Sequence, residues 1–68
     1  MNPGFAAFQK LKNHISNKLK LPPIQAATLA SKVKNEYKEK FPDLNSVELT
    51  EKSINYFDQN INKFEKMV

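Results

Sequence analysis

Histidine and cysteine, the side chains most often used for nucleophilic and acid–base chemistry, are nearly missing from this sequence. His14 is the only histidine, and there is no cysteine. A catalytic nucleophile needs an activating base and a third group that orients the base. On a helix with the apolar spacing described below, His14 would fall on the polar side, among Lys10 and Asn13. We therefore predict that His14 is a solvated helix residue and that the protein is not an enzyme.

A pair of glutamates comes closest to a two-carboxylate site. Glu36 and Glu39 lie three residues apart, which places both on one face of a helix. Lys32 and Lys40 each lie four residues from Glu36, the spacing at which opposite charges pair on a helix. Surface ion pairs explain this arrangement better than acid–base catalysis, so no catalytic residue is predicted.

Asp43, Asn45 and Glu48 could supply oxygen ligands for a metal ion. A calcium loop needs a longer run of ligands at fixed spacing and a glycine at its sharp turn, and neither is found here. Asn45 and Glu48 have the spacing of a helix cap, which accounts for both residues. No metal site and no cofactor are predicted.

Lysine is the most informative residue type, because its distribution is uneven. Residues 1–34 hold six lysines and no Asp or Glu, a formal +6, and residues 35–68 hold five lysines and seven acids, a formal −2. Such an uneven distribution of charge indicates the kind of partner rather than the fold. The chain has no arginine, and this argues against sequence-specific base readout. Eleven lysines and eight asparagines fit either AT-rich coding or a nucleic-acid surface. The candidate nucleic-acid contacts are Lys10, Lys12, Lys18, Lys20, Lys32 and Lys34.

Prolines divide the chain into three segments with helical periodicity, and no segment has the pattern of a strand. Asn2 and Pro3 have the pattern of an N-cap followed by a proline in the first turn. Pro22 and Pro23 end one helix and open the next, and Pro42 ends the second. We predict an all-α, small three-helix bundle with helices at about 3–20, 23–41 and 46–66. Residues 1–68 form a single helical domain.

Apolar residues at spacings of three and four define the expected core. A chain of this length buries only about 60% of its unfolded surface, so its margin of stability is thin. The predicted core residues are Phe8, Leu11, Ile15, Leu19, Leu29, Val33, Tyr37, Phe41, Leu44, Ile54, Phe57, Ile61 and Phe64.

The third segment has the most regular pattern, with two neighbouring rows. The first row alternates spacings of three and four without interruption and is typical of one face packed into a core, or of a short heptad repeat. It consists of Val47, Thr50, Ile54, Phe57, Ile61, Phe64 and Val68. The second row contains Leu49, Tyr56 and Met67. If the first row is buried, these three are partly exposed and could bind a partner, or they could widen the buried face. They are the candidate partner-binding residues.

Part of the chain resembles the first two helices of an HMG box or of the related YABBY-type module. In those modules an apolar helix leads through a Pro-x-Leu turn to a capped second helix that carries an aromatic residue. The matching positions are Leu29, Val33, Tyr37, Pro42-Asp43-Leu44, Asn45 as the cap, Glu48-Leu49, and Phe57 in place of the usual tryptophan. The resemblance covers residues 29–57 and its motif is mostly capping and core chemistry. The corner carries five lysines and six acids between Thr28 and Asp58, so DNA kinking by a minor-groove wedge is not carried over. Short lysine- and asparagine-rich relatives occur among virion proteins of large DNA viruses, which implies a structural or packaging role.

These observations favour a small structural or protein-interaction protein that belongs to a larger assembly such as a virus particle. The expected partner is another protein or a second copy of the chain. The alternative is sequence-independent nucleic-acid binding through the six lysines named above. Membrane binding is not favoured, because the lysines of the first segment scatter around its axis, whereas interfacial helices keep them on one face. Without a secretory signal pattern, we expect an intracellular location, in cytoplasm or nucleus, or a place inside a virus particle.

Overall fold

Three long helices and one short helix make up the fold in the computed structural model, which describes residues 3–68. The helices are α1 (Pro3–Leu19), α2 (Pro23–Lys40), α3 (Ser46–Gln59) and α4 (Ile61–Glu65). The predicted all-α bundle is therefore confirmed, and the short α4 is an addition to it. Asn2, the expected cap of α1, lies outside the described residues.

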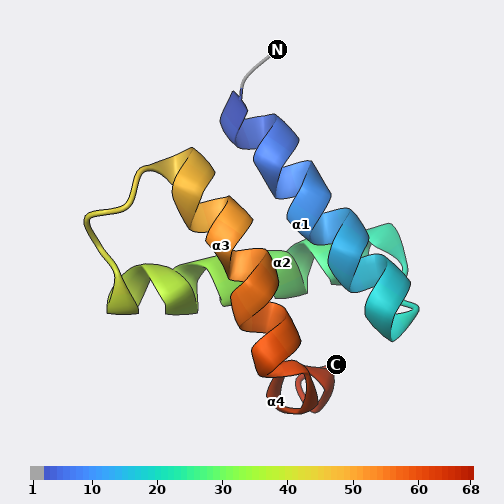
Figure 1. The fold of residues 1–68 in the computed structure, drawn as a ribbon. Helices are drawn as coiled ribbons and strands as arrows, with labels where there is room; N and C mark the ends of the chain where they lie inside the picture. Colours follow the sequence, from blue (N-terminus) through green and yellow to red (C-terminus); the bar gives the residue numbers. More distant parts are fainter. Residues whose placement is uncertain (1–2) are drawn as a thin grey trace.

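The helices form two layers. Figure 1 shows α1 and α3 side by side, with α2 crossing behind both. Each pair of the three long helices is in contact. The Cα atoms span 29 × 27 × 15 Å, the dimensions of a thin plate. The core lies between the layers, so each long helix buries one face and exposes the other.

The helix ends follow local chemistry. Pro23 occupies the first turn of α2, where its missing N–H is not needed. The Asn45 side chain accepts a 2.9 Å hydrogen bond from the Glu48 backbone N–H, which confirms the predicted cap. At the end of α1, Lys20 takes a left-handed conformation with φ 57° and the Leu21 N–H donates to the Ser16 carbonyl. This Schellman-type end, and not the proline pair alone, terminates α1.

Asn60 interrupts the third predicted helix, so the expectation of one helix over 46–66 is wrong at this point. Its backbone leaves helical geometry with φ −125° and ψ 29°. Its side-chain amide donates to the Tyr56 carbonyl at 2.9 Å, a local bond that competes with the helical ladder. The Phe64 N–H then donates to the Asn60 carbonyl at the start of α4. The apolar row continues through this position, but the helix does not.

The predicted core is confirmed at six positions and needs correction at others. Fully buried are Leu11, Ile15, Leu29, Val33, Phe57 and Phe64. Partly buried are Phe8, Leu19, Tyr37, Leu44, Ile54 and Ile61. The prediction was wrong for Phe41, which is 49% exposed because it caps the end of α2 with non-helical backbone angles. Further buried apolar residues are Ala7, Ala26, Ala30 and Leu49.

The buried face of α3 is rotated from the predicted row toward the second row. Leu49, Thr50, Ser53 and Phe57 are its buried residues. At 100° per residue, their mean direction differs by about 65° from that of the predicted row. The reason is that α3 contacts two neighbours, α1 and α2, and must present residues to both. The Thr50 and Ser53 hydroxyls donate to carbonyls one turn back, so both polar side chains are satisfied in the core.

Candidate interaction surface

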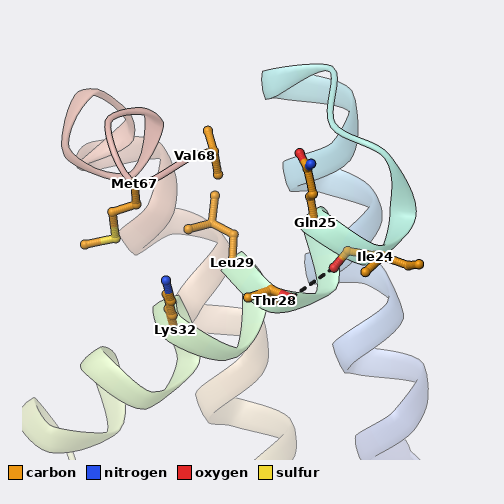
Figure 2. Close-up of a pocket in the computed structure, with 7 residues that line it drawn as sticks. All are labelled: Ile24, Gln25, Thr28, Leu29, Lys32, Met67 and Val68. Atoms are coloured by element: carbon orange, nitrogen blue, oxygen red, sulfur yellow. Dashed lines mark hydrogen bonds between the residues drawn. The ribbon is translucent and has the colours of Figure 1, made fainter.

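Exposed apolar side chains gather around one hollow at the N-terminal half of α2. Ile24 is 82% exposed, Met67 44% and Val68 57%. They border a hollow of about 240 Å³ together with Leu29, which is buried and forms part of its lining. Figure 2 shows the hollow between α2 and the segment that follows α4, with Leu29 pointing toward Val68. Single exposed apolar side chains are normal, but three around one hollow form a patch, so this surface is the candidate functional site.

The polar residues of the hollow give it a single charge. Gln25, Thr28 and Lys32 complete the lining, and no acidic residue is among the lining residues. The Thr28 hydroxyl donates to the Ile24 carbonyl at 3.1 Å, so it is directed back to its own helix. Among the side chains that line this hollow, Lys32 carries the charge.

Two local features build the hollow. Pro23 starts α2 early enough to place Ile24 and Thr28 on its outer side. The interruption at Asn60 starts a new helix, and the Met67 N–H donates to the Phe64 carbonyl at 3.0 Å beyond its end. Because Phe64 is fully buried, it anchors the segment that carries Met67 against the core.

The three candidate partner-binding residues of the second row do not share one surface. Leu49 is only 3% exposed, so the expectation that it is free to contact a partner is wrong, and it widens the buried face instead. Tyr56 is partly buried, and its hydroxyl donates to Glu36. Met67 is exposed and lines the hollow. The row breaks up because Leu49 belongs to the buried face of α3 and α3 ends at Gln59, before Met67.

Tyr56 belongs to a network between α2, α3 and α4. The Glu36 carboxylate accepts hydrogen bonds from the Tyr56 hydroxyl at 2.9 Å and from the Lys63 ammonium. The bond from Lys63 is the main cause that holds the pKa of Glu36 below its ordinary value. Burial, followed by the bond to Glu36, raises the pKa of Tyr56. Lys40 stands 5.4 Å from the centre of the Tyr56 ring, a cation–π geometry.

The ion pair of Glu36 thus differs from the predicted one. Its partner is Lys63, 27 residues away, and not Lys32 or Lys40 on the same helix. Helical spacing could not reveal this pair, because it depends on where α4 lies against α2. Lys32 lines the apolar hollow next to Ile24 and Met67 instead.

His14 also has a partner that the sequence did not indicate. Its Nε2 lies 2.7 Å from an Asp58 carboxylate oxygen, and its ring meets Phe57 edge-on at 5.9 Å. His14, predicted to be a solvated helix residue, keeps 25% of its side chain exposed and lies between α1 and α3. The contacts of His14 with Phe57 and Asp58 link α1 to α3.

The six candidate nucleic-acid lysines are distributed over α1, its C-terminal end and α2. Lys10, Lys18, Lys20 and Lys32 are exposed, and Lys12 and Lys34 are partly buried. Lys10 borders a hollow that Glu51 also lines, and Lys34 borders another with Glu48. Because α3 lies beside α1, the acidic part of the sequence is placed next to the basic part. The charge separation in the sequence is therefore reduced in space, and nucleic-acid binding by these lysines stays a prediction.

Two features are absent from the part of the chain that the structure describes. Across residues 3–68, no group of three or more His, Cys, Asp or Glu side chains is placed to hold a metal ion. Within the same range, none of the helices combines the length and apolar character that crossing a membrane requires.

Comparison with known proteins identifies no relative: no protein-family model, curated protein or solved structure matches the chain. The resemblance of residues 29–57 to an HMG-box corner therefore stays a prediction, and the site has to be interpreted from its own geometry.

Proposed function

We propose that this chain is a non-catalytic protein-interaction module that docks an acidic, amphipathic segment of another protein. The observation that carries the proposal is the hollow over Leu29, bordered by the exposed Ile24, Met67 and Val68. A larger assembly such as a virus particle, the setting implied by the HMG-box resemblance, would use such a module to hold neighbouring proteins together.

The size of the hollow suits part of a helix. Its α2 side runs from Ile24 to Lys32, about 12 Å at 1.5 Å per residue, or roughly two turns. A helix that docks in a groove presents apolar side chains at spacings of three and four. Such side chains would pack against the apolar lining of the hollow, which includes Ile24, Leu29 and Met67.

The charge of the surface favours an acidic partner over a second copy. The chain carries a formal +4, and Lys32 is the charged side chain that lines the hollow. Two copies meeting at this surface would bring like charges together, which is unfavourable. An Asp or Glu beside the apolar side chains of the partner would instead pair with Lys32.

Photo-crosslinking in the source cells tests the proposal. A crosslinking amino acid replaces Ile24 in one variant and Lys38, an exposed residue farther along α2, in the control. We expect position 24 to give one discrete protein adduct whose crosslinked peptide is apolar and acidic, and position 38 to give none. Ile24→Asp and Lys32→Glu should each weaken binding of that peptide by about tenfold or more, equivalent to about 1.4 kcal/mol.

Three outcomes contradict the proposal. Equal adducts at positions 24 and 38 would mean that the hollow is not a specific site. Adducts only to a second copy, with a dimer by sedimentation that Ile24→Asp abolishes, would assign the hollow to self-association. If Lys32→Glu binds the peptide as tightly as the wild type does, the partner is not recognised through an acidic residue.

A further inference from the structure

We propose that a second hollow, between α2 and α3, binds single-stranded nucleic acid by stacking one base against the Tyr37–Tyr56 pair. This hollow has a volume of about 260 Å³ and is lined by Tyr37, Lys52, Asn55, Tyr56 and Gln59. It shares no lining residue with the apolar hollow. Its one lysine, Lys52, is not among the six lysines predicted to contact nucleic acid.

Aromatic rings form one wall. The Tyr37 and Tyr56 ring centres lie 5.2 Å apart, and Phe41 extends the pair with its centre 4.9 Å from that of Tyr37. Phe41 is 49% exposed, so the aromatic surface continues into solvent. Stacking on aromatic side chains holds the bases of single strands and tolerates any sequence, because every base has a π-face.

The Tyr56 ring is held in place before any ligand binds. Its hydroxyl donates to Glu36 at 2.9 Å, and its ring contacts Phe64 edge-on at 5.8 Å. Phe64 is fully buried, so the ring is fixed to the core. Binding to a preformed surface avoids part of the entropic cost of ordering side chains.

Polar side chains of α3 flank Tyr56 in the lining of this hollow. Lys52, Asn55 and Gln59 follow one another at spacings of three and four, which places them on one face of the helix. Side-chain amides both donate and accept, so they can meet the edge of any base. Lys52 supplies a cation for the adjoining phosphate, as lysine does along single-strand grooves.

These properties favour a nucleotide strand over a peptide. Aromatic grooves for proline-rich peptides are mostly apolar, whereas three of the five residues here carry polar N–H donors. Glu36, the nearest acid of the network, is already neutralised by Lys63. Duplex DNA would keep its bases stacked inside, so we expect preference for single strands. The absence of arginine is no obstacle, since stacking does not read the base sequence.

The two tyrosines give a direct readout. The chain has two tyrosines and no tryptophan, so its tyrosine fluorescence comes only from this hollow. We expect a short oligothymidylate to quench it with saturation, and an abasic strand of equal length to bind at least about tenfold more weakly, since stacking contributes about 1–3 kcal/mol per base.

Matched charge variants locate the phosphate contact. Lys52→Glu and Lys18→Glu change the net charge equally, and both positions are exposed. We expect Lys52→Glu to weaken binding by about tenfold and to lower the salt slope, and Lys18→Glu to have a much smaller effect. Ile24→Asp should leave binding unchanged, which separates this site from the proposed protein-docking hollow.

Each contrary result overturns the proposal. Equal affinity for the abasic strand would show that charge attraction alone, without base stacking, explains the binding. Equal losses in Lys52→Glu and Lys18→Glu would show that the binding is not located at this hollow. Quenching by a proline-rich peptide but not by oligothymidylate would assign the hollow to peptide recognition. Absence of quenching and of binding at low salt would remove the site altogether.

Discussion

The two halves of α2 are used in opposite ways. Toward its C-terminal end, Glu36 is bonded to Tyr56 of α3 and to Lys63 of α4, and Tyr37 contacts the Tyr56 ring. Toward its N-terminal end, Ile24 and Lys32 border a hollow that the rest of the chain leaves open. Both halves are amphipathic, so the difference lies in which other helices pack against each half.

The Glu36 network of the C-terminal half ties three helices together, whereas the apolar hollow at the N-terminal end is open to a protein partner. Residues of the C-terminal half have partners far away in the sequence, so changing them should alter folding. Exposed residues around the apolar hollow have few contacts to lose, so changing them should alter binding and leave folding nearly intact. The predictions below test this division from the largest expected effect to the smallest.

Phe64 joins the two halves, so its truncation should have the largest effect. It is fully buried, stacks on Phe57 with ring centres 5.9 Å apart, and anchors the segment that carries Met67. We expect Phe64→Ala to cost about 3–5 kcal/mol of unfolding free energy, as for other buried aromatic residues. Chemical denaturation followed by circular dichroism measures this loss.

The matched control is Phe5→Ala, because Phe5 is 56% exposed. Its cost should stay within about 0.5 kcal/mol, as at most surface sites. If the two variants lose the same stability, Phe64 does not hold the fold together and the anchoring of the hollow has to be rejected.

Acid should weaken the C-terminal half of α2 through Glu36. Because the pKa of Glu36 is lowered by folding, the unfolded chain takes up its proton first as the pH falls. The stabilisation is complete above the ordinary value of 4.5 and is lost as the pH falls through the lower folded value. The effect should be small, because Glu36 and Lys63 are both partly solvated and water screens their attraction.

Urea titrations at neutral and acid pH compare wild type with Glu36→Gln. The difference between them should shrink as the pH falls below 4.5. A difference that stays constant over this range would show that the charge of Glu36 does not contribute. The same network should also weaken in strong alkali, because folding raises the pKa values of Tyr56 and Lys63.

Local chemistry made part of this structure predictable. Proline positions gave the boundaries of α2, and the spacing of Asn45 and Glu48 gave the cap of α3. These features depend on neighbours in the sequence, for which steric and hydrogen-bonding rules are strong. Helical spacing also identified Leu11 and Phe57 as core residues.

Features that depend on how helices pack could not be predicted in the same way. The interruption at Asn60 follows a row of apolar residues that is compatible with a continuous helix. The burial of Leu49 follows from the rotation of α3 toward two neighbours. The Glu36–Lys63 pair joins residues 27 apart in the sequence. The apolar hollow combines α2 with Met67 and Val68. Of its lining residues, the sequence predicts Met67 as a partner contact and Lys32 as a nucleic-acid contact, and it does not indicate that the two lie together.

Ile24→Gln should have the smallest effect on folding, and it tests the N-terminal half of α2 most directly. Ile24 is 82% exposed, so little apolar contact is lost and the unfolding free energy should change by no more than about 0.5 kcal/mol. Removing exposed apolar surface should at the same time raise solubility and weaken partner binding. Thermal and urea unfolding, measured beside a peptide-binding titration, give both quantities for one variant. A loss of about 2 kcal/mol or more would mean that Ile24 contributes to the core, and the assignment of the hollow at the N-terminal end of α2 to protein docking would then be wrong.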